Sequence, residues 1–143
     1  MTRTLLVVLA AALGIGCGPH WDGTYLGFIT YTDSCGGSEQ DPESWTVIQN
    51  GGVVTIRPLD TTCGDFTADL NGSNAVLRSQ TCDPLYDSTT GYTYQQHFTG
   101  GSLTMQGEHL TGSETYIVDF YNGPSYPYSY SCSGTAALDL FRH

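Results

Sequence analysis

Five cysteines are the residues whose type and spacing carry the clearest chemistry in this chain. The first, Cys17, directly follows an apolar N-terminal segment that ends with the small residues Gly14 and Gly16. A thiolate is a nucleophile, so a cysteine can accept a lipid or be joined to a second cysteine. The other four have no Cys-x-x-Cys spacing, which argues against a metal site. These four are Cys35, Cys63, Cys82 and Cys132. We therefore expect one modified cysteine, two disulfides and no bound metal or cofactor.

Residues 1–16 have the three parts of an export signal. Arg3 supplies a positive charge, the run from Leu5 to Leu13 is apolar, and small residues precede the expected cleavage point. That run is too short for a helix to cross a bilayer core of roughly 30 Å, which disfavours a plain membrane anchor. Together with Cys17, the segment resembles the bacterial lipobox, with Gly14 where that motif usually has leucine. The resemblance implies cleavage before Cys17 and lipid on its thiol, with ordinary secretion as the alternative.

The lipobox resemblance also implies a location and a domain organisation. Gly18 follows the cysteine, and no aspartate stands there to resemble an inner-membrane retention signal. We therefore expect a protein of the bacterial cell envelope, anchored in the outer membrane rather than the inner one. Residues 17–20 would form the lipidated cysteine and a short tether, and residues 21–143 a single domain.

The part of the chain after residue 16 is strongly acidic. It contains all 14 acidic residues, three arginines and no lysine, which gives a formal charge of 3 − 14 = −11. Such a surface repels phosphate groups, so nucleic acid is not expected as a partner. It favours solubility and could attract cations or basic proteins.

The turn residues that position these side chains indicate an all-β fold. Ten tyrosines and eighteen glycines are typical of strands joined by tight turns, and no long helical periodicity occurs after residue 16. Three stretches alternate on both sides of a glycine turn, as β-hairpins do. The turns are at residues 50–52, 71–74 and 106–109. We expect eight to ten antiparallel strands in an up-and-down meander that forms a closed or nearly closed barrel, or else a sandwich. We also expect turns at 100–101 and 122–124, and longer loops at 36–43 and 83–91.

Hairpin register suggests which cysteines pair. If residues 71–74 form the turn, paired numbers sum to 145, and Cys63 then faces Cys82. That leaves Cys35 with Cys132. If the first and last strands pair antiparallel around this bond, Ile29 faces Leu138 and Tyr25 faces Arg142. Apolar residues then meet apolar residues, which supports the register.

The two ends of the expected barrel resemble a known family. Gly23-Thr24-Tyr25 opens the first strand and Arg142 ends the last. The arrangement is similar to the calycins, which include the lipocalins. They begin with Gly-x-Trp and place a basic residue of the final strand over that tryptophan, whereas Tyr25 stands in its place here. The resemblance implies an antiparallel barrel closed by the Tyr25–Arg142 pair, and a ligand-binding interior.

No motif in the sequence indicates catalysis. Nucleophile-elbow, zinc-protease, phosphate-loop and calcium-loop patterns are all absent, and the four histidines have no ligand spacing. Asp65 and Asp69 lie four apart on an expected strand, about 13 Å from each other and too far to cooperate as a retaining pair. We therefore expect that the protein is not an enzyme. A deep polar pocket with two close carboxylates would instead indicate an enzyme.

Tyrosines form the remaining candidate site. Residues 126, 128 and 130 alternate, and an alternating set shares one face of a strand. The cluster around them is Tyr116, Tyr121, Tyr126, Tyr128 and Tyr130. These side chains either pack in the barrel or form a binding surface, since tyrosine offers both an apolar ring and a hydroxyl. Our leading hypothesis is a binding module that holds a small apolar or amphipathic ligand in the barrel. The alternative is a structural lipoprotein with a filled barrel that binds an envelope protein or glycan through the tyrosines.

Overall fold

The computed structural model describes residues 18–59, 63–123 and 128–143. Cys17 and Tyr126, two of the candidate residues, lie outside this part of the chain. All regular structure in it is β-strand. The strands are β1 (Gly23–Asp33), β2 (Ser38–Asn50), β3 (Val53–Pro58), β4 (Phe66–Asn71), β5 (Asn74–Leu77), β6 (Gln80–Thr81), β7 (Leu85–Asp87), β8 (Tyr92–Gln106), β9 (His109–Asn122) and β10 (Tyr128–Arg142).

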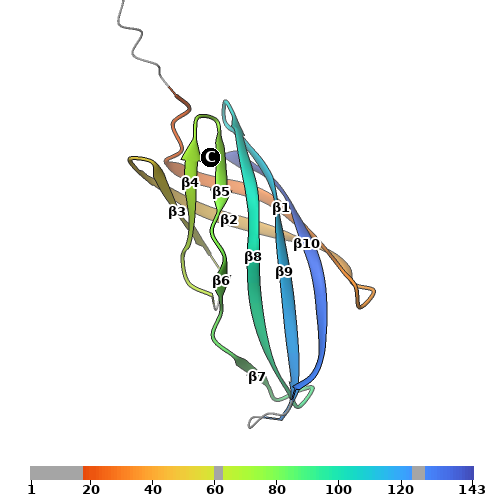
Figure 1. The fold of residues 1–143 in the computed structure, drawn as a ribbon. Helices are drawn as coiled ribbons and strands as arrows, with labels where there is room; N and C mark the ends of the chain where they lie inside the picture. Colours follow the sequence, from red (N-terminus) through yellow and green to blue (C-terminus); the bar gives the residue numbers. More distant parts are fainter. Residues whose placement is uncertain (1–17, 60–62, 124–127) are drawn as a thin grey trace, which may run out of the picture.

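Hydrogen bonds link eight of these strands into a ring (Figure 1). Strands β1 to β5 follow one another around it, β8, β9 and β10 complete it, and β10 pairs with β1. One edge of β8 is covered in turn by β5, β6 and β7, so the ring is not a clean barrel. Every pairing is antiparallel, and the expected all-β, up-and-down fold with two disulfides is confirmed.

Strand register follows the turns. Leu70 pairs with Ala75, as expected from a turn at residues 71–74, and Tyr25 pairs with Arg142, as expected from the antiparallel pairing of the first and last strands. The disulfides join Cys63 to Cys82, with Cα atoms 4.4 Å apart, and Cys35 to Cys132, with Cα atoms 5.6 Å apart. The strand pairings that form the ring and both disulfides join residues between Gly23 and Arg142.

Three sequence-based expectations about loops were wrong. Residues 38–43 are the first part of β2 and pair with β1, although their composition is polar. The expected loop at 83–91 contains β7, which pairs with β8. Gly100 and Gly101 form no turn, because β8 runs unbroken from Tyr92 to Gln106. Instead the register shifts between Phe98 and Gly100, and Gly100 adopts a positive φ of 140°. Thr99 is the extra residue of a β-bulge, a common device for bending a strand.

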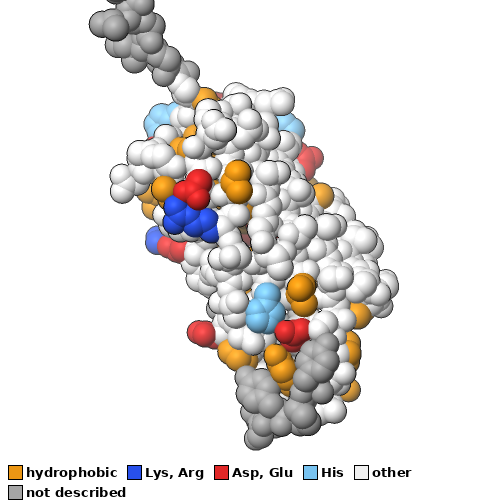
Figure 2. Space-filling model, in the orientation of Figure 1, with side chains coloured by type: hydrophobic (Ala, Val, Ile, Leu, Met, Phe, Trp, Pro, Cys, Tyr) orange, Lys and Arg blue, Asp and Glu red, His pale blue; other side chains and the backbone are white. Residues whose placement is uncertain are grey.

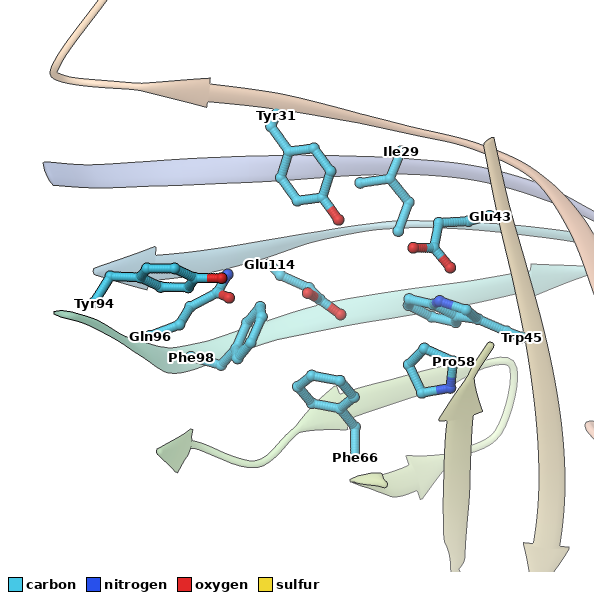
Figure 3. Close-up of a pocket in the computed structure, with 10 residues that line it drawn as sticks. All are labelled: Ile29, Tyr31, Glu43, Trp45, Pro58, Phe66, Tyr94, Gln96, Phe98 and Glu114. Carbon is cyan, nitrogen blue, oxygen red and sulfur yellow. The ribbon is translucent and has the colours of Figure 1, made fainter. Parts of the chain in front are cut away.

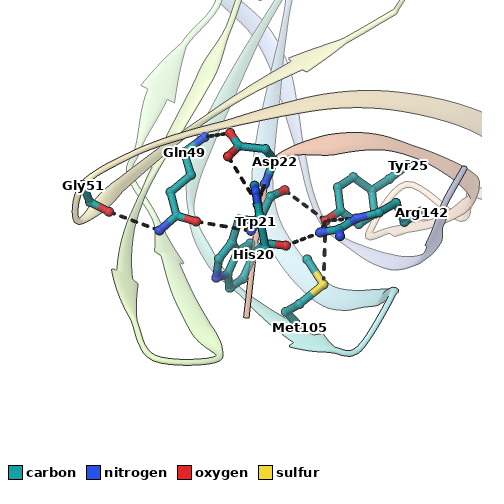
Figure 4. Close-up of polar contacts among 8 residues, drawn as sticks. All are labelled: His20, Trp21, Asp22, Tyr25, Gln49, Gly51, Met105 and Arg142. Carbon is teal, nitrogen blue, oxygen red and sulfur yellow. Dashed lines mark hydrogen bonds and ion pairs between the residues drawn. The ribbon is translucent and has the colours of Figure 1, made fainter. Parts of the chain in front are cut away.

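One end of the ring has a dense network of contacts (Figure 4). We call it the proximal end and define it by Trp21, Tyr25, Gln49, Met105 and Arg142. The Trp21 side chain is 1% exposed, and its backbone carbonyl accepts a 2.9 Å hydrogen bond from the Tyr25 hydroxyl. The guanidinium of Arg142 donates to that hydroxyl over 2.7 Å and lies 5.4 Å from the Tyr25 ring centre. It also donates to the carbonyl of His20.

Candidate functional site

A cavity of about 270 Å³ lies inside the ring, beyond the apolar core of the proximal end (Figure 3). Side chains from six strands line it, because alternate residues of every strand point inward. They are Ile29 and Tyr31 from β1, Glu43 and Trp45 from β2, Pro58 from β3, Phe66 from β4, Tyr94, Gln96 and Phe98 from β8, and Glu114 from β9.

Glu114 is the most unusual residue of the cavity. Its side chain is only 5% exposed, and its Oε1 atom has no hydrogen-bond partner among the described residues. Its two cross-strand neighbours are small, Gly101 on β8 and Ala136 on β10. Burying a carboxyl group without compensation is unfavourable, and such groups in folded proteins normally have a partner. Glu114 therefore lines the cavity as a buried carboxyl group, one oxygen of which has no hydrogen-bond partner among the described residues.

Glu43 brings a second carboxyl group to the same space. It lies opposite Gly27 in the β1–β2 pairing, so one of its neighbours also lacks a side chain. Figure 3 shows the carboxyl groups of Glu43 and Glu114 and the hydroxyl of Tyr31 pointing into the cavity. The cavity thus combines two acidic groups with a hydroxyl.

Burial and mutual repulsion change the acidity of these groups. Burial, with a further contribution from the charge of Glu43, raises the pKa of Glu114 from 4.5 to about 7. Burial also raises the pKa of the Tyr31 hydroxyl, and the charges of Glu43 and Glu114 add to this effect. Glu114 consequently exchanges its proton near neutral pH, whereas Tyr31 stays protonated.

Aromatic rings form much of the remaining wall. Phe66 and Phe98 pack edge to face with centres 4.7 Å apart, Phe98 lies 6.4 Å from Tyr116, and Tyr116 lies 6.1 Å from Tyr31. Tyr116 fits there because residue 134, its partner on β10, is glycine. A Cβ atom at Gly134 would lie 2.5 Å from the Tyr116 ring. The rings therefore form a continuous apolar surface next to the carboxyl groups.

A groove continues from the cavity toward the other end of the ring. The two share Tyr31, Tyr94 and Gln96. The groove adds Asp33, Glu39, Tyr116, Val118 and Phe120. We call this region the distal end and define it by Asp33, Glu39, Tyr94, Phe120 and Tyr130. The described residues that line the cavity and the groove include four acidic residues and no basic one.

The arginines lie elsewhere. Arg57 pairs with Asp65 at 2.7 Å and Arg78 with Asp69 at 2.5 Å, both on the outside, where Figure 2 shows arginine side chains against acidic ones. Asp65 and Asp69, the two aspartates considered above as a catalytic pair, are thus each bound to an arginine. Arg142 lies at the proximal end.

The tyrosines of the candidate binding surface separate into different environments. Tyr116 is buried in the core, and Tyr121 is half-buried and pairs with Thr93. Tyr130 is 43% exposed and stacks on Phe120 with ring centres 4.7 Å apart. The β9–β10 register shifts between Tyr128 and Tyr130.

Sequence reasoning missed Glu43 and Glu114. A signal for Glu114 was present, since Leu110, Gly112, Glu114 and Tyr116 alternate along an expected strand whose apolar members point inward. Glu43 lies in the loop expected at 36–43, but in the structure it belongs to β2 and lines the cavity.

Comparison with family models, with curated proteins and with solved structures finds no match to this chain. Across residues 18–59, 63–123 and 128–143, no helix has the length and apolar character needed to cross a membrane. The same residues contain no cluster of three or more potential metal ligands of the histidine, cysteine or carboxylate type.

Proposed function

We propose that this protein is a lipid-anchored component of the bacterial cell envelope that holds a small amphipathic ligand inside its strand ring. The observation that carries the proposal is the buried Glu114, which lines an aromatic cavity and whose Oε1 lacks a hydrogen-bond partner in the described structure. Ligand sites typically combine apolar walls with a few convergent polar groups. The volume of about 270 Å³ lies just below the range of roughly 300–1,000 Å³ that is usual for ligand pockets, so a small ligand is expected.

The location and the family likeness are parts of the same proposal. The export segment and Cys17 support a lipid anchor, and replacement of Cys17 by serine should release the protein from membranes. The contact of Arg142 with Tyr25 supports a relationship to the lipocalin type of barrel. That type binds its ligands in the barrel interior, where the cavity of this protein lies.

Native mass spectrometry tests the ligand proposal. Residues 18–143, exported to an oxidising compartment, should carry an extra mass that disappears on denaturation. In Ala136→Leu, the larger side chain beside Glu114 should reduce that mass or abolish it. Ala137→Leu is the matched control, because Ala137 is exposed on the opposite face of the same strand. Circular dichroism and an intact mass with two disulfides would show that both variants are folded.

The proposal would be overturned if the native mass of the unaltered protein equals that of the protein alone and no small amphipathic compound binds on titration. That result would favour the alternative of a filled barrel that works through its surface. Tyr86 and Tyr130, exposed at 49% and 43%, would then be the first residues to replace.

The two glutamates also favour a second candidate, a hydrolase. A carboxyl group of raised pKa near a second carboxylate is the arrangement used by many glycosidases. Turnover of aryl glycosides that is lost in both Glu43→Gln and Glu114→Gln would support catalysis. Binding without turnover would support the carrier.

A further inference from the structure

We infer that the ligand is an organic cation, with its ammonium or similar group held between Glu114, Glu43 and the aromatic wall and its apolar part directed along the groove. The inference rests on the proposed ligand-binding function and adds the chemical class of the ligand. Its starting point is the buried Glu114 Oε1, an acceptor without a donor in the described structure.

The charge of the site favours a cation over other ligands. Glu43 and Glu114 line the cavity, Asp33 and Glu39 line the adjoining groove, and no described residue lining either is basic. An anion would meet these carboxylates without compensation, which is strongly unfavourable at low dielectric. A cation would neutralise the buried Glu114 carboxylate, whose Oε1 has no hydrogen-bond partner among the described residues.

The walls favour an organic cation over a metal ion. Trp45, Tyr31 and Tyr94 present aromatic rings to the cavity, together with Phe66 and Phe98. The face of an aromatic ring attracts an ammonium group, and tryptophan does so most strongly. Calcium and magnesium prefer six or more oxygen ligands, which this largely aromatic wall does not supply.

A titration with three probes of similar chain length tests the inference. Hexyltrimethylammonium, 1-hexanol and hexanoate each have an unbranched chain of six carbons, the carboxyl carbon of hexanoate included, and differ in the charge of the head group. Calorimetry on residues 18–143 measures each Kd at pH 8. We expect hexyltrimethylammonium to bind at least ten-fold more tightly than hexanol, and hexanoate to bind least. A quaternary ammonium keeps its charge at every pH, so its own titration cannot affect the result.

Variants locate the bound charge. Glu114→Gln and Glu43→Gln should each raise the Kd of hexyltrimethylammonium by ten-fold or more. The Kd of hexanol should change by less than two-fold in both variants. Glu108→Gln removes an equal charge from the exposed β8–β9 turn and should change neither Kd by more than two-fold. Equal losses in all three variants would indicate a general effect of net charge and would overturn the inference.

The outcomes separate this inference from the proposal on which it rests. Hexanol or hexanoate could bind as tightly as the ammonium probe, and Ala136→Leu could weaken that binding. This result would show that the ligand need not be a cation, and it would still support the ligand-binding function. If no probe binds and the native mass is clean, both are wrong. Preference for the ammonium that depends on Glu114 and Glu43 supports both.

Discussion

The proximal and distal ends of the ring are stabilised by different interactions. At the proximal end, Trp21, Tyr25 and Leu140 are almost fully buried, and Arg142 adds hydrogen bonds to the Tyr25 hydroxyl. Toward the distal end the interior contains a cavity and a groove, and the strands that surround it are crosslinked. Cys35, in the β1–β2 turn, is bonded to Cys132 near the start of β10.

The ring contains empty space where disulfide bonds, and not a filled core, hold its strands. A well-packed core contributes stability through contact and apolar burial, which a ligand cavity forfeits. Covalent bonds restore stability without filling the interior. The comparison predicts that changes at the proximal end lower stability and spare binding, whereas changes toward the distal end alter both.

The largest expected effect comes from removing the distal disulfide. In Cys35→Ser/Cys132→Ser, the free energy of unfolding should fall by roughly 4–5 kcal/mol, because the bond joins residues 97 apart in sequence. Cys63→Ser/Cys82→Ser breaks a bond between residues 19 apart and should cost about 3 kcal/mol. Urea unfolding under non-reducing conditions measures both. This prediction assumes that a disulfide stabilises by restricting the unfolded chain, and more so for a longer loop. A larger loss of unfolding free energy from Cys63→Ser/Cys82→Ser than from Cys35→Ser/Cys132→Ser would contradict it.

Trp21→Ala tests the proximal end. The side chain is 1% exposed, so its removal should lower the free energy of unfolding by about 3–4 kcal/mol. Trp21→Phe should recover most of this, since it retains a ring and removes an Nε1 donor that has no partner among the described residues. The Kd of a cavity ligand, measured by calorimetry under conditions where the protein is folded, should change less than two-fold. A loss of affinity equal to that of Glu114→Gln would show that the two ends are not independent.

Glu114→Gln should change how stability depends on pH. The pKa of Glu114 is raised in the folded protein to about 7, so the folded state binds the proton more tightly than the unfolded state. Stability is therefore lost as pH rises from 4.5 through 7, by on the order of 3 kcal/mol. Glu43 on β2 and Tyr31 on β1 face the group, while its neighbours Gly101 on β8 and Ala136 on β10 do not titrate.

The glutamine variant should thus be more stable than the unaltered protein at pH 8 and similar to it at pH 4.5. Urea unfolding at several pH values measures this, and Glu108→Gln should retain the original profile. A variant less stable than the unaltered protein at pH 8 would mean that the Glu114 carboxylate is compensated in the apo state.

Arg142→Gln should have the smallest effect. It removes a guanidinium that bonds the Tyr25 hydroxyl and the His20 carbonyl and lies over the Tyr25 ring. We expect a loss of about 1–2 kcal/mol, since Tyr25 can still donate to the Trp21 carbonyl. Arg142→Lys should recover only part of it, because an ammonium cannot reproduce both contacts. Thermal unfolding measures the series, and an unchanged midpoint in Arg142→Gln would show that the pair does not hold this end.

Much of the fold could be predicted because its turns are explicit. Glycine turns determined the register of β4 with β5, and that register brought Cys63 to Cys82. The bulge at Gly100 could not be predicted, since a glycine pair is equally typical of a turn, and only long-range pairing with β9 distinguishes the two. The first half of β2 was missed because its polar residues have low intrinsic strand propensity and are ordered by pairing with β1.

The candidate site was harder to predict than the fold. Acidic residues are usually solvated, so Glu43 and Glu114 looked like ordinary surface residues. Their significance depends on the residues that surround them in the ring, such as Tyr31 on β1 and Phe98 on β8, which line the same cavity. Only the assembled ring brings these side chains and the two carboxyl groups together.

The position of the N-terminal segment has a consequence for how a ligand would arrive. The described chain enters the ring at the proximal end (Figure 1). The groove is lined by Asp33 at the end of β1 and Glu39 near the start of β2, so it lies toward the distal end, near the β1–β2 turn. With lipid on Cys17, residues 17–20 would hold the proximal end against the bilayer, and the entrance would face the aqueous compartment. A ligand would then be exchanged with bulk solution and not by lateral entry from the leaflet. The lipid would determine where the protein resides, while the concentration of dissolved cation would determine how much of the protein is occupied.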